Sequence, residues 1–437
     1  MKRVSDFSNC TGCAACVDIC PQHAIKMLLN QEGFLYPKID EKRCNLCGLC
    51  FTRCPSANPT YVNEQTPCCI AAMAPQRANS SSGGAFTVLA EETLRQGGYV
   101  CGAAWTDNLE VKHIIISKKE DLYKLQKSKY IQSTVSDIYP QIKKLLAQNK
   151  KVFFTGTPCQ VAGLNAYLNN KYDNLLTADL ICHGVPSPKV FKQYLHELPL
   201  SSNEKIQSFD FRDKKEGWSY NLLSKAITNK NTYTFSSHYD VFYQSFLKNL
   251  SLRKSCGKCP FARLPRQGDI TLGDFWKIWD YNPKLDDQEG TSLILINTSK
   301  GLAFLAPIKN QFLTYQKMPL KVAIQGNPCL IQSTQEHKER QTFFNNLGKI
   351  SLQENLDICL GRKYDCGILN FWHTNNFGAL LTCYALQEFL QQHGKNTRVI
   401  NYIPPYWHSR FHGNISEDFS NKYLKLTHLC TNMTELK

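Results

Sequence analysis

Two cysteine runs near the N-terminus limit most strongly what this chain can fold into. The first, CTGCAACVDICP, spans Cys10 to Pro21, and the second, CNLCGLCFTRCP, spans Cys44 to Pro55. Each run has the spacing C-x2-C-x2-C-x3-C-P, which holds two 4Fe-4S clusters when the fourth cysteine of each run ligates the other cluster. The predicted ligands are therefore Cys10, Cys13, Cys16 and Cys54 for one cluster, and Cys44, Cys47, Cys50 and Cys20 for the other.

A pair of zinc sites is the alternative for these cysteines. Zinc sites usually combine one C-x2-C pair with a distant second pair or with histidines, whereas each run here has four cysteines of its own. Between the runs, residues 24–27 and 33–40 alternate in polarity and predict a small hairpin that covers the clusters. We therefore expect residues 1–60 to form a bacterial-type ferredoxin domain with two 4Fe-4S clusters.

The cysteine content and the charge indicate where such a domain works. The chain has 437 residues and 20 cysteines, and clusters together with free thiols indicate a reducing compartment, so we expect a cytoplasmic protein. Residues 1–9 do not resemble a signal peptide, and no apolar stretch is long enough to predict a transmembrane segment. The formal net charge of +15 comes from scattered basic residues. This pattern indicates a solvated surface, or an acidic redox partner or phosphorylated cofactor, rather than nucleic acid.

The second predicted domain covers residues 66–335, where strands alternate with helices as in an α/β or α+β layer fold. Residues 99–105 and 111–117 form an expected strand pair. The other expected strands are 151–154, 175–182, 269–276 and 292–298, and the expected helices are 87–96, 161–168 and 189–198.

Three loops between a strand and a helix are rich in small residues: SSSGGAF, TGTPCQ and CHGVPSP. Exposed amides at a helix N-terminus attract phosphate, and ligands of such sheets lie beyond the carboxyl ends of the strands. Each loop alone could be a simple turn, but the three together favour a cofactor site. The expected contacts are Ser82, Gly83, Gly84, Gly156, Thr157, Pro158 and Gly184.

Four more cysteines suggest a third 4Fe-4S cluster near this cofactor. Two of them lie in the loops, and the other two form the C-x2-C of SCGKCPF. The candidate ligands are Cys159, Cys182, Cys256 and Cys259. A small zinc site, or buried thiols that pack as small apolar side chains, are the alternatives. Other cysteines, namely Cys68, Cys69 and Cys101, have no such grouping, and we expect them to be packing residues.

Two charged or titratable positions are candidate catalytic residues. His183 lies between Cys182 and Gly184, and it could supply a proton because its ordinary pKa is near neutrality. Lys214, with Arg212 in the stretch DFRDK, could pair with a phosphate or an anionic substrate. A structural role is the alternative for both His183 and Lys214.

The motifs together resemble a known family. SSGGAF, KSKYIQS, FTGTPCQVAGL, LICHGVPSP, FRDK and CGKCPFARLPRQGDITLGDFW follow in this order. They resemble the beta subunit of coenzyme F-420 hydrogenase/dehydrogenase, with the ferredoxin domain in front. The resemblance implies FAD in the α/β domain, clusters that connect it to a one-electron partner, and hydride exchange with a deazaflavin or another organic substrate. The sequence has no Rossmann G-x-G-x-x-G, so the flavin contacts above rest on loop position alone.

A third segment covers residues 363–437, after an expected linker at 336–362. Its start predicts a strand, an Asn/Gly loop, an amphipathic helix that stops at Gly394, and a second strand. The stretch NNFGALLTCYALQ resembles the opening βαβ unit of a polysaccharide pyruvyltransferase. We expect an incomplete Rossmann-like segment, either a fragment of a longer fusion or a vestige, which hints at polysaccharide biosynthesis as the context.

These observations predict an α+β or α/β multidomain protein that is an iron-sulfur, flavin-dependent oxidoreductase. Clusters carry single electrons, an organic hydride acceptor takes two, and a flavin can do both. The expected partners are a ferredoxin or another redox protein and a small-molecule hydride acceptor or donor, such as a coenzyme F-420-like compound. The alternatives are a non-catalytic electron-transfer adaptor subunit and a fragment of a bifunctional oxidoreductase/pyruvyltransferase.

Overall fold

The computed structural model describes residues 2–135, 137–198, 200, 203–219, 222–362, 366–368 and 377–399. The chain divides into two compact units, one of residues 1–198 and 206–353 and the other of residues 199–205 and 354–437. None of the helices described is both long enough and apolar enough to span a bilayer.

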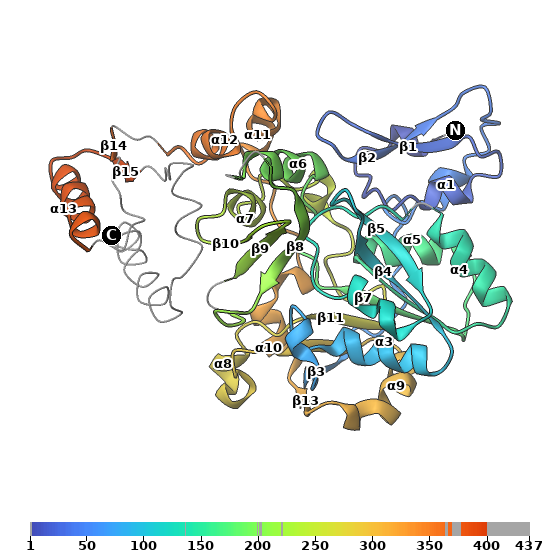
Figure 1. Ribbon diagram of the computed structural model, residues 1–437. Coiled ribbons are helices and arrows are strands. Elements are labelled where there is room, and N and C mark those ends of the chain that lie inside the picture. The colour runs from blue at the N-terminus through green and yellow to red at the C-terminus, as the bar shows by residue number, and fades with distance from the viewer. Residues whose placement is uncertain are drawn as a thin grey trace. The chain divides into compact units, whose positions relative to one another are not determined.

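An eight-stranded mixed sheet forms the centre of the first unit (Figure 1). The strand order is β13-β3-β12-β11-β7-β6-β4-β5. Strands β4, β6, β7 and β11 are parallel neighbours, and the other pairings are antiparallel. The strands are β3 (Cys68–Met73), β4 (Tyr99–Trp105), β5 (Val111–Ile116), β6 (Val152–Gly156), β7 (Leu175–Leu180), β11 (Ile270–Asp274), β12 (Ser292–Ile296) and β13 (Thr314–Met318).

The sheet has an apolar core on each face because its central strands are mostly buried and carry apolar side chains on both faces. Phe153 of β6 packs with helix α3 (Ala85–Arg95) on one face. Phe154, the next residue, packs on the other face with α4 (Ile138–Ala147) and α5 (Pro158–Leu168). Shorter helices complete the cover: α8 (Ile278–Tyr281), α9 (Ser299–Leu305) and α10 (Leu320–Gly326).

The predicted strand–helix units of this domain are confirmed. Strands β4 and β5 pair antiparallel with Trp105 opposite Val111, and helices α5 and α6 (Pro188–Glu197) follow β6 and β7. Helix α5 begins three residues earlier than predicted, because Pro158 occupies its first turn and Thr157 caps it together with Gln160. Cys101 is buried in the core that contains Phe154, and Cys69 is buried in a further core with residues of α8 and α10, as expected for packing residues.

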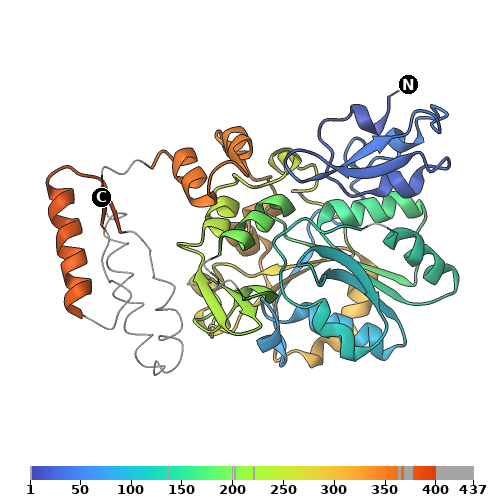
Figure 2. The ribbon, with the colours of Figure 1, turned by 45° about the horizontal axis from the view of Figure 1, so that its top comes forward.

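The N-terminal domain packs directly on this sheet domain. It contains α1 (Ala15–Ile19), the antiparallel hairpin β1 (Ile25–Leu29) and β2 (Leu35–Ile39), and α2 (Leu49–Thr52), so the predicted hairpin is confirmed. Apolar residues of the first cysteine run share one core with helices α4 and α5. Figure 2 shows this domain beside the green α4 and α5.

A second, three-stranded sheet was not predicted. Strands β8 (Ile206–Asp213), β9 (Leu223–Thr228) and β10 (Thr232–Ser236) are antiparallel in the order β10-β9-β8. Apolar residues alternate there only over short stretches, such as Phe209 to Phe211 and Tyr233 to Phe235, so the sequence pattern is short. Aromatic rings bind this sheet to α6 and α7 (Val241–Leu247), among them Phe191, Phe211 and Phe242.

The last part of the first unit is helix α11 (Arg340–Asn346), whose Arg340 forms a two-bond ion pair with Glu32 of the N-terminal domain. The second unit contains most of α12 (Leu352–Cys359), then β14 (Cys366–Ile368), α13 (Phe377–Gln392) and β15 (Thr397–Val399). Strands β14 and β15 pair in parallel, which confirms the predicted βαβ unit. Residues 400–437 lie outside the described residues.

Candidate iron-sulfur sites

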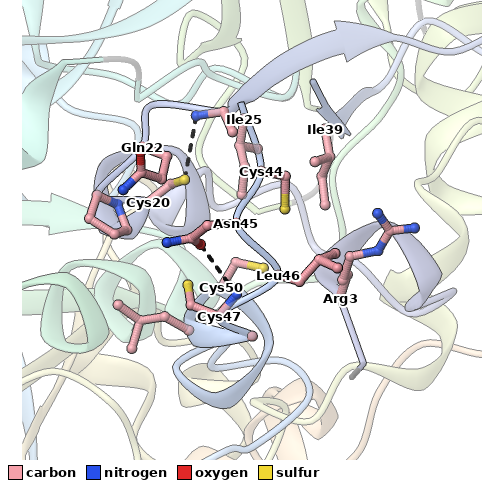
Figure 3. A pocket seen from close by; sticks show the side chains of 14 residues that line it. Arg3, Cys20, Gln22, Ile25, Ile39, Cys44, Asn45, Leu46, Cys47 and Cys50 are labelled. Carbon is pink, nitrogen blue, oxygen red and sulfur yellow. Dashed lines mark hydrogen bonds between the residues drawn. The ribbon is translucent and has the colours of Figure 1, made fainter. Parts of the chain in front are cut away.

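One cavity in the N-terminal domain is lined by the four cysteines predicted for one cluster. Figure 3 shows Cys44, Cys47 and Cys50, which belong to one short stretch of chain, together with Cys20 from the end of the first run. Ile25 and Ile39 of the hairpin, with Leu46 and Leu49, supply apolar walls. The Ala24 amide donates to the Cys20 sulfur at 3.4 Å. Four thiols around one cavity with apolar walls fit a 4Fe-4S cluster.

The other predicted set in this domain is buried as a group. Cys10, Cys13, Cys16 and Cys54 each expose less than a tenth of their surface. Burial raises the pKa of Cys13 and of Cys16, and the charges of the neighbouring cysteines raise both pKa values further. The raised pKa values favour neutral thiols, and a bound cation would favour the thiolate form that ligates metal. Iron is a cation that such thiolates bind.

The third set of cysteines also converges, although its members are far apart in the sequence. Cys159, Cys182, Cys256 and Cys259 line one cavity of the first unit. Cys159 lies in the first turn of α5 and Cys182 follows β7, so the parallel pairing of β6 and β7 brings them to the same sheet edge. Cys256 lies in the short 3-10 helix η4 (Lys254–Lys258).

The charge environment of this third set resembles that of the buried set of Cys10, Cys13, Cys16 and Cys54. Burial raises the pKa of Cys159 to about 11 and that of Cys256 to about 12, and nearby cysteines add to both shifts. Burial also raises the pKa of Cys182 and of Cys259. The Thr157 hydroxyl lies 3.1 Å from the Cys159 sulfur. These four side chains also fit a 4Fe-4S cluster.

Three residues of this cavity were not identified from the sequence. Cys329 is a fifth cysteine in its wall, and Thr11 extends into it from the first cysteine run. Arg266, fully buried, also lines it and pairs with Asp179 at 3.1 Å. Cys329 stands alone in NPCLIQS, so no local spacing signals it.

The set of Cys10, Cys13, Cys16 and Cys54 is a neighbour of the third set. Helix α5 carries Cys159 in its first turn, and one turn later Gly163 lies so close to Cys13 that an added Cβ would be 3.2 Å from the Cys13 sulfur. Thr11 also lines the cavity of the third cysteine set, called the third cavity below, and its hydroxyl lies 2.8 Å from the Ser56 hydroxyl. The predicted ligand sets therefore adjoin one another through α5 and the Cys10–Cys13 loop.

The two candidate catalytic residues lie in different places. His183 lines the third cavity, where its Nε2 lies 2.7 Å from Asn249 Oδ1, and burial lowers its pKa. Lys214 donates hydrogen bonds to the main-chain carbonyls of Arg77, Ser82 and Glu289 at 2.6–2.8 Å. Arg212 is fully buried and pairs with Asp274 at 2.9 Å. Lys214 therefore holds the loop before α3 to the main chain of Glu289 through these hydrogen bonds.

The glycines predicted to contact a flavin lie against protein atoms. An added Cβ on Gly83 would be 2.3 Å from the Ser292 nitrogen, and one on Gly84 would be 2.9 Å from the Ala74 Cβ. The corresponding neighbour of Gly156 is Gln160, and that of Gly184 is Leu252. Thr157, Pro158 and Gly184 line the third cavity, whereas Ser82–Gly84 are not part of it. Close packing accounts for these glycines without a ligand.

Within the described ranges, no three His, Cys, Asp or Glu side chains are grouped for a single metal ion. A 4Fe-4S cluster is larger than one ion, since its cysteines ligate different irons.

Comparisons with known proteins divide the chain in a similar way. Residues 9–58 match the family model of the 4Fe-4S dicluster domain. Residues 149–319 match the family model for the C terminus of the coenzyme F420 hydrogenase/dehydrogenase beta subunit. An uncharacterized protein of Methanocaldococcus jannaschii is 24% identical over 363 residues, which cover 72% of this chain and 91% of that protein. A chain from the F420-reducing [NiFe] hydrogenase complex of Methanosarcina barkeri aligns with a TM-score of 0.42 and 16% identity, over 68% of this chain and 91% of that one.

Proposed function

We propose that this relative of the coenzyme F420 hydrogenase/dehydrogenase beta subunits, which carries a 4Fe-4S dicluster domain, is an iron-sulfur oxidoreductase. It would exchange electrons between a ferredoxin-like redox protein and an organic two-electron substrate. The observation that carries this proposal is the grouping of three sets of four cysteines. Two sets line cavities, and the set that contains Cys10 is buried beside the cavity of the third set.

The protein's part in this chemistry is to hold the clusters and to limit the access of water. When bound, a 4Fe-4S cluster takes up or releases an electron. The cavity around Cys20, Cys44, Cys47 and Cys50 is called the outer cavity, and these cysteines are the outer set. Its apolar walls, such as Ile25 and Ile39, keep water away from the sulfurs. Solvent access and hydrogen bonds to sulfur both affect the reduction potential of a cluster. Cys47, the one exposed ligand of the outer set, marks a side on which a redox protein can approach.

A flavin remains the proposed cofactor for the two-electron half of the reaction. The relation to the beta-subunit family supports FAD, and a flavin can exchange both single electrons and hydrides. Of the contacts expected from the sequence, Thr157, Pro158 and Gly184 line the third cavity and are retained in this proposal. Ser82, Gly83, Gly84 and Gly156 are not retained, because they do not line it and the three glycines pack against protein atoms. His183 would supply a proton at the third cavity, and Lys214 would order the loop before α3 through its carbonyl contacts. The organic substrate would be coenzyme F-420 or a similar hydride acceptor or donor, in the cytoplasm.

A non-catalytic adaptor that passes electrons to a larger complex is the second candidate. Close packing around the loop glycines favours it, because an adaptor needs clusters but no flavin. The βαβ unit of β14, α13 and β15 supports a polysaccharide context through its resemblance to pyruvyltransferases, as in a fragment of a bifunctional protein.

Anaerobic purification with analysis of iron, sulfide and flavin tests these proposals. We expect about twelve iron atoms per chain, four for each cluster, and one FAD. Clusters without flavin would select the adaptor. An absence of both iron and cluster EPR signals after reconstitution would reject the electron-transfer function altogether.

A further inference from the structure

Arg253 is a fully buried arginine between two of the cysteine sets. Its side chain is 1% exposed. The guanidinium donates to the main-chain carbonyl of Cys10 at 2.8 Å and to that of Leu35 at 3.0 Å. It also lies over the Tyr36 ring, 4.1 Å from the centroid. An added Cβ on Gly12 would be 2.9 Å from its Nη1. The positive charge therefore lies against the Cys10–Cys13 loop.

The main chain of Arg253 is hydrogen-bonded to residues that line the third cavity. Its carbonyl accepts a hydrogen bond from the Cys256 amide at 2.9 Å, and its amide donates to the carbonyl of Val185 at 3.0 Å. Val185 and Cys256 both line the third cavity. One residue thus connects, through its side chain and its main chain, the loops that carry Cys10 and Cys256.

Arg253 differs from the other fully buried arginines by its partners. Arg212, Arg266 and Arg340 each form an ion pair with a carboxylate. No carboxylate in the described part of the chain is ion-paired with Arg253, whose partners are carbonyl oxygens, aromatic rings and the Gln132 amide at 3.3 Å. A buried charge needs an opposite charge nearby. Clusters held by four thiolates have a net negative charge, and two such sets adjoin this residue.

We propose that Arg253 is the shared counter-cation of two clusters, the one bound by Cys10, Cys13, Cys16 and Cys54 and the one bound by Cys159, Cys182, Cys256 and Cys259. Reduction adds negative charge to a cluster, and a nearby fixed cation favours it. Arg253 therefore raises the reduction potentials of both clusters and leaves that of the outer cluster, at Cys20, Cys44, Cys47 and Cys50, unchanged. This inference rests on the proposed function, because it requires that the clusters are bound.

An EPR-monitored redox titration of the reconstituted full chain tests the proposal. Signals are assigned by their loss in Cys47→Ala and in Cys256→Ala. Arg253→Gln removes the charge, and Gln132→Glu places a carboxylate against the guanidinium while keeping the side-chain shape. We expect both variants to shift the same two midpoint potentials to lower values, with the outer cluster unmoved and the iron content full. Arg253→Lys keeps the charge and should stay closer to the wild type.

The double variant Arg340→Gln/Glu32→Gln is the matched control, since it removes a buried arginine next to Leu252 without changing the net charge. It should leave all three potentials at their wild-type values. If Gln132→Glu has full iron and wild-type potentials, the inference is wrong even where Arg253→Gln fails to fold. Wild-type protein without cluster signals would instead reject the proposed function, and the inference with it.

Discussion

The Tyr139 hydroxyl donates a hydrogen bond to the main-chain carbonyl of Cys13 at 2.9 Å and so joins helix α4 to the first cysteine run. The same hydroxyl lies 3.0 Å from the carbonyl of Gln160 on α5. Burial raises the pKa of Tyr139 well above its ordinary value, so the hydroxyl stays a donor. One side chain thus connects the N-terminal domain, α4 and α5 within a shared apolar core.

Replacing Tyr139 with phenylalanine should lower the free energy of unfolding by about 1–2 kcal/mol, because the buried carbonyl of Cys13 loses this donor. Anaerobic urea unfolding measures the change. Tyr123→Phe, at an exposed position, is the control and should change stability by less than about 0.5 kcal/mol. Equal stability of the two variants would show that the hydrogen bond from Tyr139 to Cys13 does not stabilise the contact between the N-terminal domain and helices α4 and α5.

Replacing Cys256 with alanine should reduce the iron content by about four atoms per chain, one cluster's worth. Iron and sulfide analysis after anaerobic reconstitution measures the loss. Cys68→Ala is the matched control, because Cys68 packs against the sheet core and lines neither cysteine cavity. Unchanged iron in Cys256→Ala would remove the third cluster from the proposal.

Replacing Cys329 with alanine should leave the iron content unchanged, although Cys329 lines the same cavity as the third set. Four cysteines are enough for one cluster, and the sequence-predicted four are all present there. The double variant Cys259→Ala/Cys329→Ala should lose about four irons. Loss of iron in Cys329→Ala alone would show that Cys329 replaces one of the four as a ligand.

Stability should fall as the pH is lowered below about 6.5, through the protonation of His113. Burial lowers the pKa of His113 from 6.5 to about 4, and its ring lies 3.0 Å from the Thr155 carbonyl oxygen. The unfolded chain binds the proton more tightly, so this contribution is complete above pH 6.5 and is lost as the pH falls to 4. The linkage amounts to about 3 kcal/mol over that range.

Urea unfolding of wild-type protein and of His113→Gln at pH 7.5 and 5.5 measures this effect. The variant should lose less stability between the two pH values than the wild type does. His196→Gln, at an exposed position on α6, should keep the wild-type dependence. An identical pH dependence in His113→Gln would contradict the assignment to His113.

Patterns within short stretches of sequence predicted much of the fold. The two cysteine runs predicted a 4Fe-4S dicluster domain, which the family comparison supports. Alternating or continuous apolar residues predicted the hairpin of β1 and β2 and the strand–helix units around β6 and β7. These features depend on neighbours a few residues apart, so local spacing was sufficient. The sheet of β8, β9 and β10 was missed, because its alternating stretches span only a few residues each.

Only the tertiary structure decided which distant residues share a site. The sequence had grouped Cys159, Cys182, Cys256 and Cys259 only as one of several alternatives. The tertiary structure brought them to one cavity and added Cys329 to it, because parallel strands end at one sheet edge and a distant loop closes over them. It also placed Lys214 and His183, both candidate catalytic residues, in different parts of the fold. The cysteine runs determined the kind of chemistry by themselves, since each run supplies three closely spaced ligands to one cluster and its fourth cysteine to the other. The buried position of Arg253 between two ligand sets depends on contacts across more than 240 residues, which no local pattern encodes.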